Sequence, residues 1–301
     1  MLQNFKSLLE LTEYFKSEKD CQEYFSHIRW NGKPVCPYCQ HNKVYTMSDN
    51  RYKCSCCGNK FTVKVGTIFE NSKISLKKWF VAIFLLSTTK KGISSIQLSK
   101  ELGITQKSAW YMIHRIREAV IGESQNKLNG IIEVDETYIG GKESNKHNSK
   151  KQNLGRGVVG KEIVLGMVQR GGNVRAFHID DTKSTTLERF VKDNVAVESI
   201  VFTDEHKGYA QLVYPHYIVK HSHNQYVSGD VHTNTIEGFW SLVKRSVVGI
   251  YHYISPKHLN RYLQEFTHRY NHKTDKPSII MNSILKNSIG KRLPYSVLIG
   301  E

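Results

Sequence analysis

The spacing of apolar residues changes along the chain and divides it into four regions. Residues 1–30 place apolar side chains at helical intervals, which predicts short amphipathic N-terminal helices. Residues 31–70 lose that period and contain short strand-like runs between glycines, which predicts a small module of strands and turns. The helical period returns in residues 71–125, and residues 126–301 open with apolar runs of strand length.

The last region predicts an α/β domain built on one mixed sheet. Its apolar runs and one helical stretch follow in the order βββαβ: Ile131–Val134, Ile163–Val168, Val174–Ile179, Thr185–Lys192 (helix) and Ser199–Thr203. A further helix is expected around residue 237, and another opens after Ser255 with an apolar face suited to core packing. Such alternation favours a sheet flanked by helices.

Five of the six cysteines fall inside residues 36–57, where they form two CxxC pairs. Two such pairs have the spacing of a zinc ribbon, with four thiolates around a closed structural ion. We expect the zinc ligands to be the following cysteines: Cys36, Cys39, Cys54 and Cys57. Cys56 is left out because two adjacent cysteines, Cys56 and Cys57, cannot bind one metal ion without strain. The alternative is a set of unpaired thiols.

Residues 94–110 predict a helix-turn-helix, with a short helix, a turn at Gly103 and a second helix capped by Thr105. The second helix would then read a DNA major groove, with basic residues holding phosphates. We expect the DNA contacts at the following residues: Gln106, Lys107 and Arg115. The alternative is an ordinary helical hairpin that supports another domain.

The charge balance favours DNA as the partner. Lys and Arg number 43 against 27 Asp and Glu, which gives a net charge of +16 spread along the chain. Such a field attracts a polyanion, and DNA suits it because each neutralised phosphate releases counterions. An acidic membrane surface is the alternative. The longest apolar run, Trp79–Leu86, is too short to span a bilayer and the amino terminus lacks a signal-peptide core, so a cytoplasmic protein without membrane contact is expected.

Three acids stand at the ends of predicted elements. Asp135 follows the first strand, Asp204 follows the fourth, and Glu237 lies on a predicted helix. If the first and fourth strands are neighbours, these carboxylates converge, as two Mg²⁺ or Mn²⁺ ions flanking a scissile phosphate require. Taken singly, each acid also fits a turn or a helix cap.

Other residues lie close to these acids in sequence. Asn234 is one helical turn before Glu237, so its amide oxygen is a second candidate for the third ligand. Lys244 returns to nearly the same helical face after two turns and is a candidate for holding DNA phosphate. Glu133 shares a strand face with Asp135, and a supporting or surface role is expected for it.

Together these motifs resemble the zinc-ribbon DDE transposases of bacterial insertion sequences, which have an RNase H-like catalytic domain. The segments that carry the resemblance are Cys36–Cys39, Val134–Lys142, Thr203–Tyr209 and His232–Arg245. The resemblance covers nearly the whole chain. It implies that residues 126–301 form an RNase H-like domain and that the amino-terminal half binds the ends of the element.

The same resemblance implies roles for the acids. Asp135, Asp204 and Glu237 would be the DDE residues and Lys244 the accompanying basic residue. Some members of the family use Asn as the third ligand, so Asn234 stays open beside Glu237, which is preferred for its charge.

The function expected from the sequence is metal-dependent DNA cleavage and strand transfer by an insertion-sequence transposase. Bringing two element ends together implies a homo-oligomer. Two alternatives remain: a non-catalytic DNA-binding regulator, and a simple RNase H-like nuclease that cuts without joining.

Overall fold

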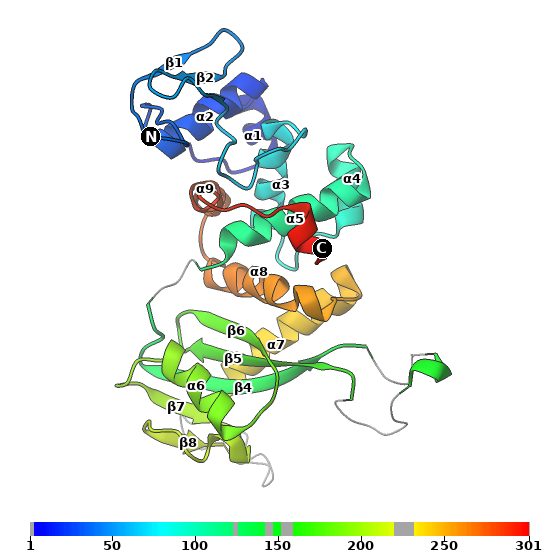
Figure 1. Ribbon diagram of the computed structural model, residues 1–301. Helices are drawn as coiled ribbons and strands as arrows, with labels where there is room; N and C mark the ends of the chain where they lie inside the picture. Colours follow the sequence, from blue (N-terminus) through cyan, green and yellow to red (C-terminus); the bar gives the residue numbers. More distant parts are fainter. Residues whose placement is uncertain (1–2, 123–125, 142–146, 152–158, 220–231, 301) are drawn as a thin grey trace. The chain divides into compact units, whose positions relative to one another are not determined.

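The computed structural model describes residues 3–122, 126–141, 147–151, 159–219 and 232–300. Contacts divide the chain into a first unit, Met1–Glu123 with Thr274–Glu301, and a second unit, Ser124–Lys273. Figure 1 labels most of the helices and strands of both units. Within the described residues, no helix has the length and apolar character needed to cross a bilayer.

The first unit combines a small sheet with helices. Its elements are α1 (Leu8–Tyr14), α2 (Glu18–Trp30), β1 (Val44–Thr46), β2 (Tyr52–Cys54), β3 (Lys60–Phe61), α3 (Leu76–Thr88), α4 (Ser95–Leu102), α5 (Gln106–Val120), α9 (Pro277–Asn287) and α10 (Tyr295–Ile299). Side-chain caps set several helix starts: Ser17 and Asp20 form a capping box on α2, and Thr105 caps α5 as predicted. Gly103, in the left-handed region at φ 58°, ends α4.

Helix α9, which follows the second unit in the chain, belongs to the first unit, whereas the sequence-based division assigned residues 126–301 to one catalytic domain. Helix α9 packs against α2, α3 and α5. Its apolar face, which includes Met281, Ile284 and Leu285, is buried in the same core as Trp79. Helical periodicity identifies a face that must be buried but carries no information on which core buries it.

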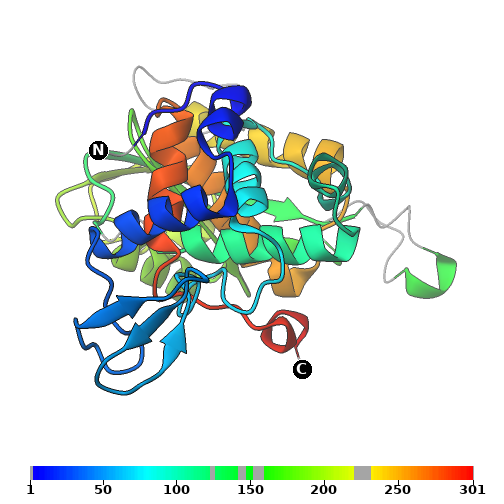
Figure 2. The ribbon, with the colours of Figure 1, turned by 90° about the horizontal axis from the view of Figure 1, so that it is seen from above.

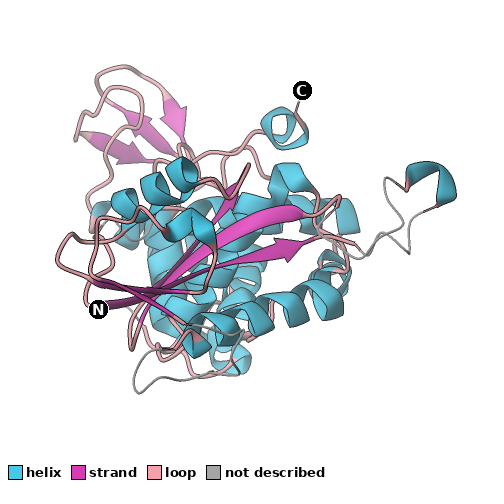
Figure 3. Ribbon diagram, turned by 90° about the horizontal axis from the view of Figure 1, so that it is seen from below, coloured by secondary structure: helices cyan, strands magenta, loops and turns pink. Residues whose placement is uncertain are grey.

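The small sheet has the antiparallel order β1-β2-β3. Figure 2 shows its three blue strands, and Figure 3 shows that they form a sheet separate from the larger one. Trp30, Tyr52 and Phe61 pack their rings together under the sheet, and the Tyr52 hydroxyl donates to Ser26 on α2. This aromatic contact joins the small sheet to the helices of the same unit.

The second unit is an α/β domain. Its elements are β4 (Ile131–Ile139), η2 (Asn148–Lys150), β5 (Glu162–Gln169), β6 (Val174–Ile179), α6 (Ser184–Asn194), β7 (Ile200–Thr203), η3 (Lys207–Tyr209), β8 (His216–Ile218), α7 (Asn234–Ser246), η5 (Val247–Tyr251, a π-turn), η6 (Pro256–His258) and α8 (Leu259–Asn271). The predicted order βββαβ is confirmed, and β8 is an additional edge strand.

The sheet of the second unit has the order β6-β5-β4-β7-β8. Strand β4 runs antiparallel to β5 and parallel to β7, so the first and fourth strands are neighbours, which is the condition under which the acids were expected to converge. This mixed sheet flanked by helices is the expected RNase H-like arrangement. Alternation turns Ile132 and Val134 toward the core that contains α6, and Glu133 and Asp135 toward α7.

Candidate active site and cysteine cluster

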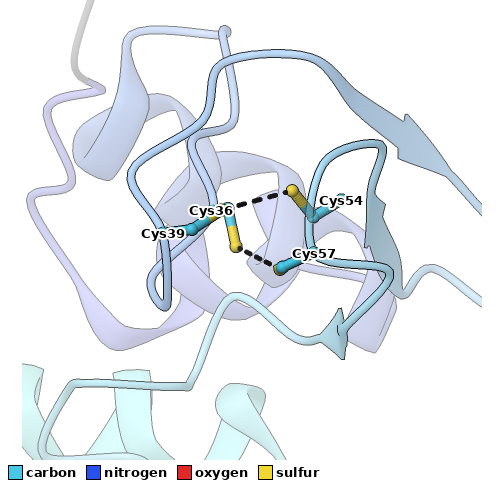
Figure 4. A group of neighbouring side chains, drawn as sticks. All are labelled: Cys36, Cys39, Cys54 and Cys57. Atoms are coloured by element: carbon cyan, nitrogen blue, oxygen red, sulfur yellow. Dashed lines mark hydrogen bonds between the residues drawn. The ribbon is translucent and has the colours of Figure 1, made fainter.

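Four thiols of the first unit form a compact cluster, which we call the cysteine cluster: Cys36, Cys39, Cys54 and Cys57. Their Sγ atoms all lie within 4.8 Å of one another. Figure 4 shows the sulfurs of the two loops facing each other, with Cys36 3.6 Å from Cys57 and Cys39 3.5 Å from Cys54. Cys56 is exposed and lies outside the cluster.

This geometry fits zinc. Tetrahedral Zn²⁺ bound at about 2.3 Å places its sulfur ligands roughly 3.8 Å apart, close to the separations observed. Cys54 lies at the end of β2, where backbone N–H groups of Cys57 and Cys56 face its sulfur and lower the pKa of the thiol to about 7. Backbone donors of this kind stabilise the thiolate that a metal requires.

Two of the proposed DNA-contacting residues are exposed at the amino-terminal end of α5. Gln106 donates to the Ser95 hydroxyl at 2.8 Å, which ties the second helix of the helix-turn-helix to the first. The ammonium of Lys107 lies 5.1 Å from the centre of the Tyr295 ring. Both side chains remain on the surface of the first unit, where a ligand can reach them.

Arg115 requires a correction, because it is buried rather than directed at a DNA phosphate. Only 4% of the residue is exposed. Its guanidinium donates to the Glu70 carbonyl at 2.6 Å and stacks over Trp79 and Tyr111. Position on a helix was the only sequence signal for Arg115, and it placed the side chain on the wrong face. The buried guanidinium joins α5 to the loop before α3.

The three proposed acids, which we call the acidic centre, come from three elements of the second unit. Asp135 lies on β4, Asp204 directly follows β7, and Glu237 lies in the first turn of α7. Burial raises the pKa of Asp135 to about 6, and the charges of Asp204 and Glu237 add to the rise. Asp135 is therefore within electrostatic reach of both other acids.

The acids are spaced more widely than the thiols. In the described residues, the cysteine cluster is the only group of three or more candidate ligands whose donor atoms all lie within 4.8 Å. A pair of divalent ions would not require such a triple contact, because each ion would take only part of the set. Hard oxygen donors in a partly buried setting fit Mg²⁺ or Mn²⁺.

Trp240 and Gly166 shape the surroundings of Asp135, and sequence reasoning did not identify either. The indole N–H of Trp240 donates to Asp135 Oδ2 at 3.0 Å. Gly166 is the cross-strand partner of Asp135 on β5. A Cβ at Gly166 would lie 2.3 Å from Cζ2 of Trp240, so glycine is required for the indole to reach the carboxylate. A glycine inside an apolar strand was the available signal.

On the opposite face of β4, Glu136 and Tyr209 lie next to the acidic centre. Burial raises the pKa of Glu136 to about 7, and the charges of Asp204 and Asp135 add to the rise. Tyr209 is 1% exposed, and burial together with the Glu136 carboxylate raises its pKa well above the ordinary value. Asp204 thus has carboxylates near it on both faces of the sheet.

The remaining candidates lie exposed on α7. Asn234 is the first residue of the helix and Lys244 is in its last turn. Glu237 accepts from the Thr233 hydroxyl at 3.1 Å. The alternative in which Glu237 only caps the helix together with Asn234 does not hold: Thr233 is the N-cap residue, and it makes no side-chain cap.

Comparison with known proteins gives matches in both units. Residues 127–271 match the ISXO2-like transposase domain, and residues 16–60 match the transposase zinc-ribbon domain. The chain is 28% identical over 271 residues to an uncharacterized protein in transposable element ISH50 of Halobacterium salinarum, covering 84% of this chain and 90% of that protein. It is 28% identical over 115 residues to an uncharacterized transposase-like protein of Haemophilus influenzae, covering 37% of this chain and 92% of that one.

A solved chain in the pre-cleavage Mos1 transpososome is also similar, at 10% identity and a TM-score of 0.28. The match covers 71% of this chain and 80% of that chain. The order and directions of the strands in the five-stranded sheet define the fold.

Proposed function

Since the chain belongs to the insertion-sequence transposases that join a zinc ribbon to an ISXO2-like domain, we propose that it cuts DNA at the ends of its element and joins them to a target. The single observation that carries this proposal is that Asp135 lies within electrostatic reach of the two other acids, Asp204 and Glu237. Strand β4 lies beside β7, α7 packs on β4, and the pKa of Asp135 responds to both Asp204 and Glu237.

In this proposal the acidic centre holds two Mg²⁺ or Mn²⁺ ions. Bound there, such ions would stabilise the attacking and leaving oxygens of a phosphodiester displacement. Asp135 feels the charges of both other acids, and its carboxylate is oriented by the Trp240 indole. Asp204 and Glu237 approach it from the end of β7 and from α7.

Two residues on α7 have auxiliary roles in the proposal. Lys244 lies two turns after Glu237, where its exposed ammonium can hold a DNA phosphate near the acids. Asn234 is the alternative third ligand. We favour Glu237 because a charged carboxylate binds a hard cation more strongly than an amide oxygen does.

The first unit is proposed to bind the element ends. Gln106 and Lys107 stand exposed at the start of α5, the position from which the second helix of a helix-turn-helix reads a major groove. The cysteine cluster holds a structural zinc ion and fixes the two loops of the ribbon. The net charge of +16 supplies attraction to DNA of any sequence.

Joining two element ends to a target requires both ends in one complex, so we propose that the protein works as a homo-oligomer on DNA in the cytoplasm. The test uses duplexes with labelled element ends, a target plasmid and Mg²⁺. Joined products are expected from the unaltered protein. Nicked ends without joining would favour a nuclease, and binding without cleavage would favour a DNA-binding regulator.

The same assay separates the two candidates for the third ligand. Glu237→Gln is expected to lower joining by about 10³-fold, since a lost ligand removes several kcal/mol of transition-state stabilisation. Asn234→Ala is expected to stay within about threefold of the unaltered protein, because an exposed amide outside the ligand set contributes little. The reverse pattern would make Asn234 the ligand.

A further inference from the structure

A fourth carboxylate of the second unit, Glu133, is buried completely and surrounded by donors. The residue is 0% exposed and lies two positions before Asp135 on the same face of β4. Its Oε1 accepts from Arg170 Nε at 2.7 Å and from the Thr235 hydroxyl at 2.9 Å, and lies 3.4 Å from His232 Nδ1. A buried charge is tolerated only when it is paired and hydrogen-bonded in this way.

The other oxygen of Glu133 caps the helix that carries Glu237. Its Oε2 accepts from the backbone N–H groups of Thr235 at 2.8 Å and Ile236 at 3.0 Å. These N–H groups belong to the first turn of α7, where the helix has no partners of its own for them. A carboxylate from β4 thus replaces the side-chain cap that α7 lacks, and it complements the positive end of the helix dipole.

Arg170, which follows β5, contacts all three segments that carry the acids. It pairs with Glu133, two residues before Asp135. Its guanidinium stacks over Phe202 at 4.7 Å, two residues before Asp204. It also donates to the His232 carbonyl at 2.7 Å, in the segment that leads into α7 and Glu237.

Two anchors set the position of α7 along β4. Glu133 binds the N–H groups of Thr235 and Ile236, and Asp135 binds the indole of Trp240. The two carboxylates are two strand residues apart, about 7 Å, and their partners are four to five helix residues apart, also about 7 Å. The spacings match, and Glu237 lies between the anchors. A slip of α7 by one residue would break both.

We propose that Glu133 and Arg170 are positioning residues, a buried pair that holds the three acid-bearing segments at the spacing the divalent ions require. The inference rests on the proposed function, because it assigns the pair a task only if the acidic centre binds ions. Neither residue touches the reacting atoms in this proposal. Their effect passes through Asp135 and Glu237, as with the outer partners that orient metal ligands in general.

The test follows the indole signals of the full-length, zinc-loaded protein by NMR while Mn²⁺ is added. Of the four tryptophans, only Trp240 is in the second unit, and its indole touches Asp135. Paramagnetic broadening of the Trp240 signal therefore reports ion binding at the acidic centre. Trp30, Trp79 and Trp110 report the folding of the first unit.

Glu133→Gln is the main variant, because it keeps the size of the side chain but places an amide donor against other donors. We expect the Mn²⁺ midpoint to rise by about tenfold or more. The matched control is Glu162→Gln on β5, which loses the partly exposed contact with His178 and should keep the original midpoint. An unchanged midpoint in Glu133→Gln overturns the positioning role.

Asp204→Asn distinguishes this inference from the proposed function. If its Trp240 signal still broadens at the original midpoint, the acidic centre is not the ion site and the proposed function fails. If that response is lost while Glu133→Gln behaves as the unaltered protein, only the positioning role fails.

Should Glu133→Gln not fold, Arg170→Lys decides the question. Lysine keeps the charge but cannot pair with Glu133, donate to the His232 carbonyl and stack on Phe202 at once. A weakened Mn²⁺ response supports the proposal, and the original midpoint overturns it. A melting temperature measured alongside separates lost ion affinity from lost stability, because an effect on folding alone leaves the midpoint unchanged in protein that remains folded.

Discussion

The cysteine cluster and the acidic centre are both assembled for metal ions, yet they differ in how closely their ligands stand. The four thiols come from two short loops of the ribbon and lie within 4.8 Å of one another. The acids come from β4, the end of β7 and α7, and they do not reach that mutual spacing in the described residues.

Electrostatics explains the contrast. Neutral thiols can pack together before they bind an ion, whereas three carboxylates repel one another. The pKa of Asp135 is raised to about 6 chiefly by burial, and the charges of Asp204 and Glu237 add the part that reflects this repulsion. Local chain geometry can therefore bring the four thiols together. The three carboxylates of the acidic centre need contacts from other residues to hold them at a fixed spacing.

The largest expected effect concerns the cluster. Cys54→Ser should lower bound zinc from about one ion per chain to nearly none and unfold the ribbon, because a structural zinc ion contributes on the order of 10 kcal/mol to folding. Zinc analysis and circular dichroism measure the change. Cys56→Ser, outside the cluster, is the control and should keep its zinc. The opposite result would place Cys56 in the ligand set.

A smaller effect is expected from the acidic centre, where Asp204→Asn should leave the fold intact. Cleavage should fall by about 10³-fold, since the lost ligand costs several kcal/mol in the transition state. Binding of element ends, measured by gel shift, should stay within about threefold because the basic surface is unchanged. Asp193→Asn, an exposed acid on α6, is the matched control. Comparable cleavage by the two variants would remove Asp204 from the site.

Stability against pH tests the cost of ionising Asp135 beside the other acids. The pKa of Asp135 is raised above its ordinary value, so the folded state prefers the protonated form and this contribution to stability is lost as pH rises through about 6. Zinc-loaded protein without Mg²⁺ should lose on the order of 1–3 kcal/mol between pH 5 and 7.5, and Mg²⁺ should restore it. Melting curves of the unaltered protein and Asp135→Asn isolate this contribution: the variant should keep the loss due to Glu136, whose pKa is raised to about 7, and lack only the part due to Asp135.

The smallest effect concerns the orientation of Asp135. Trp240→Phe removes the indole donor and should cost about 1–2 kcal/mol, or roughly tenfold in cleavage. Gly166→Ala should lower cleavage at least as much, because its Cβ would lie 2.3 Å from the Trp240 indole. The double variant should lose less cleavage activity than the sum of the two single losses predicts, since phenylalanine lacks the atoms that clash with the alanine Cβ. Strictly additive losses would contradict this packing account.

The sequence by itself determined the elements and the types of ligand. Apolar runs identified β4 to β7, CxxC spacing identified the thiols, and the acids were found at strand and helix ends because those signals are local. Thr105 as the cap of α5 was also predictable, since a cap depends only on residues within one helical turn.

Only the tertiary structure decided which faces meet. It buried Arg115 against Glu70 and Trp79, placed α9 in the first unit, and brought Gly166 under Trp240. It also turned Glu133 from an expected supporting or surface residue into a buried cap on α7. Local patterns specify that a face or a charge needs a partner, but the partner comes from residues far along the chain, and its identity depends on packing that no short segment encodes.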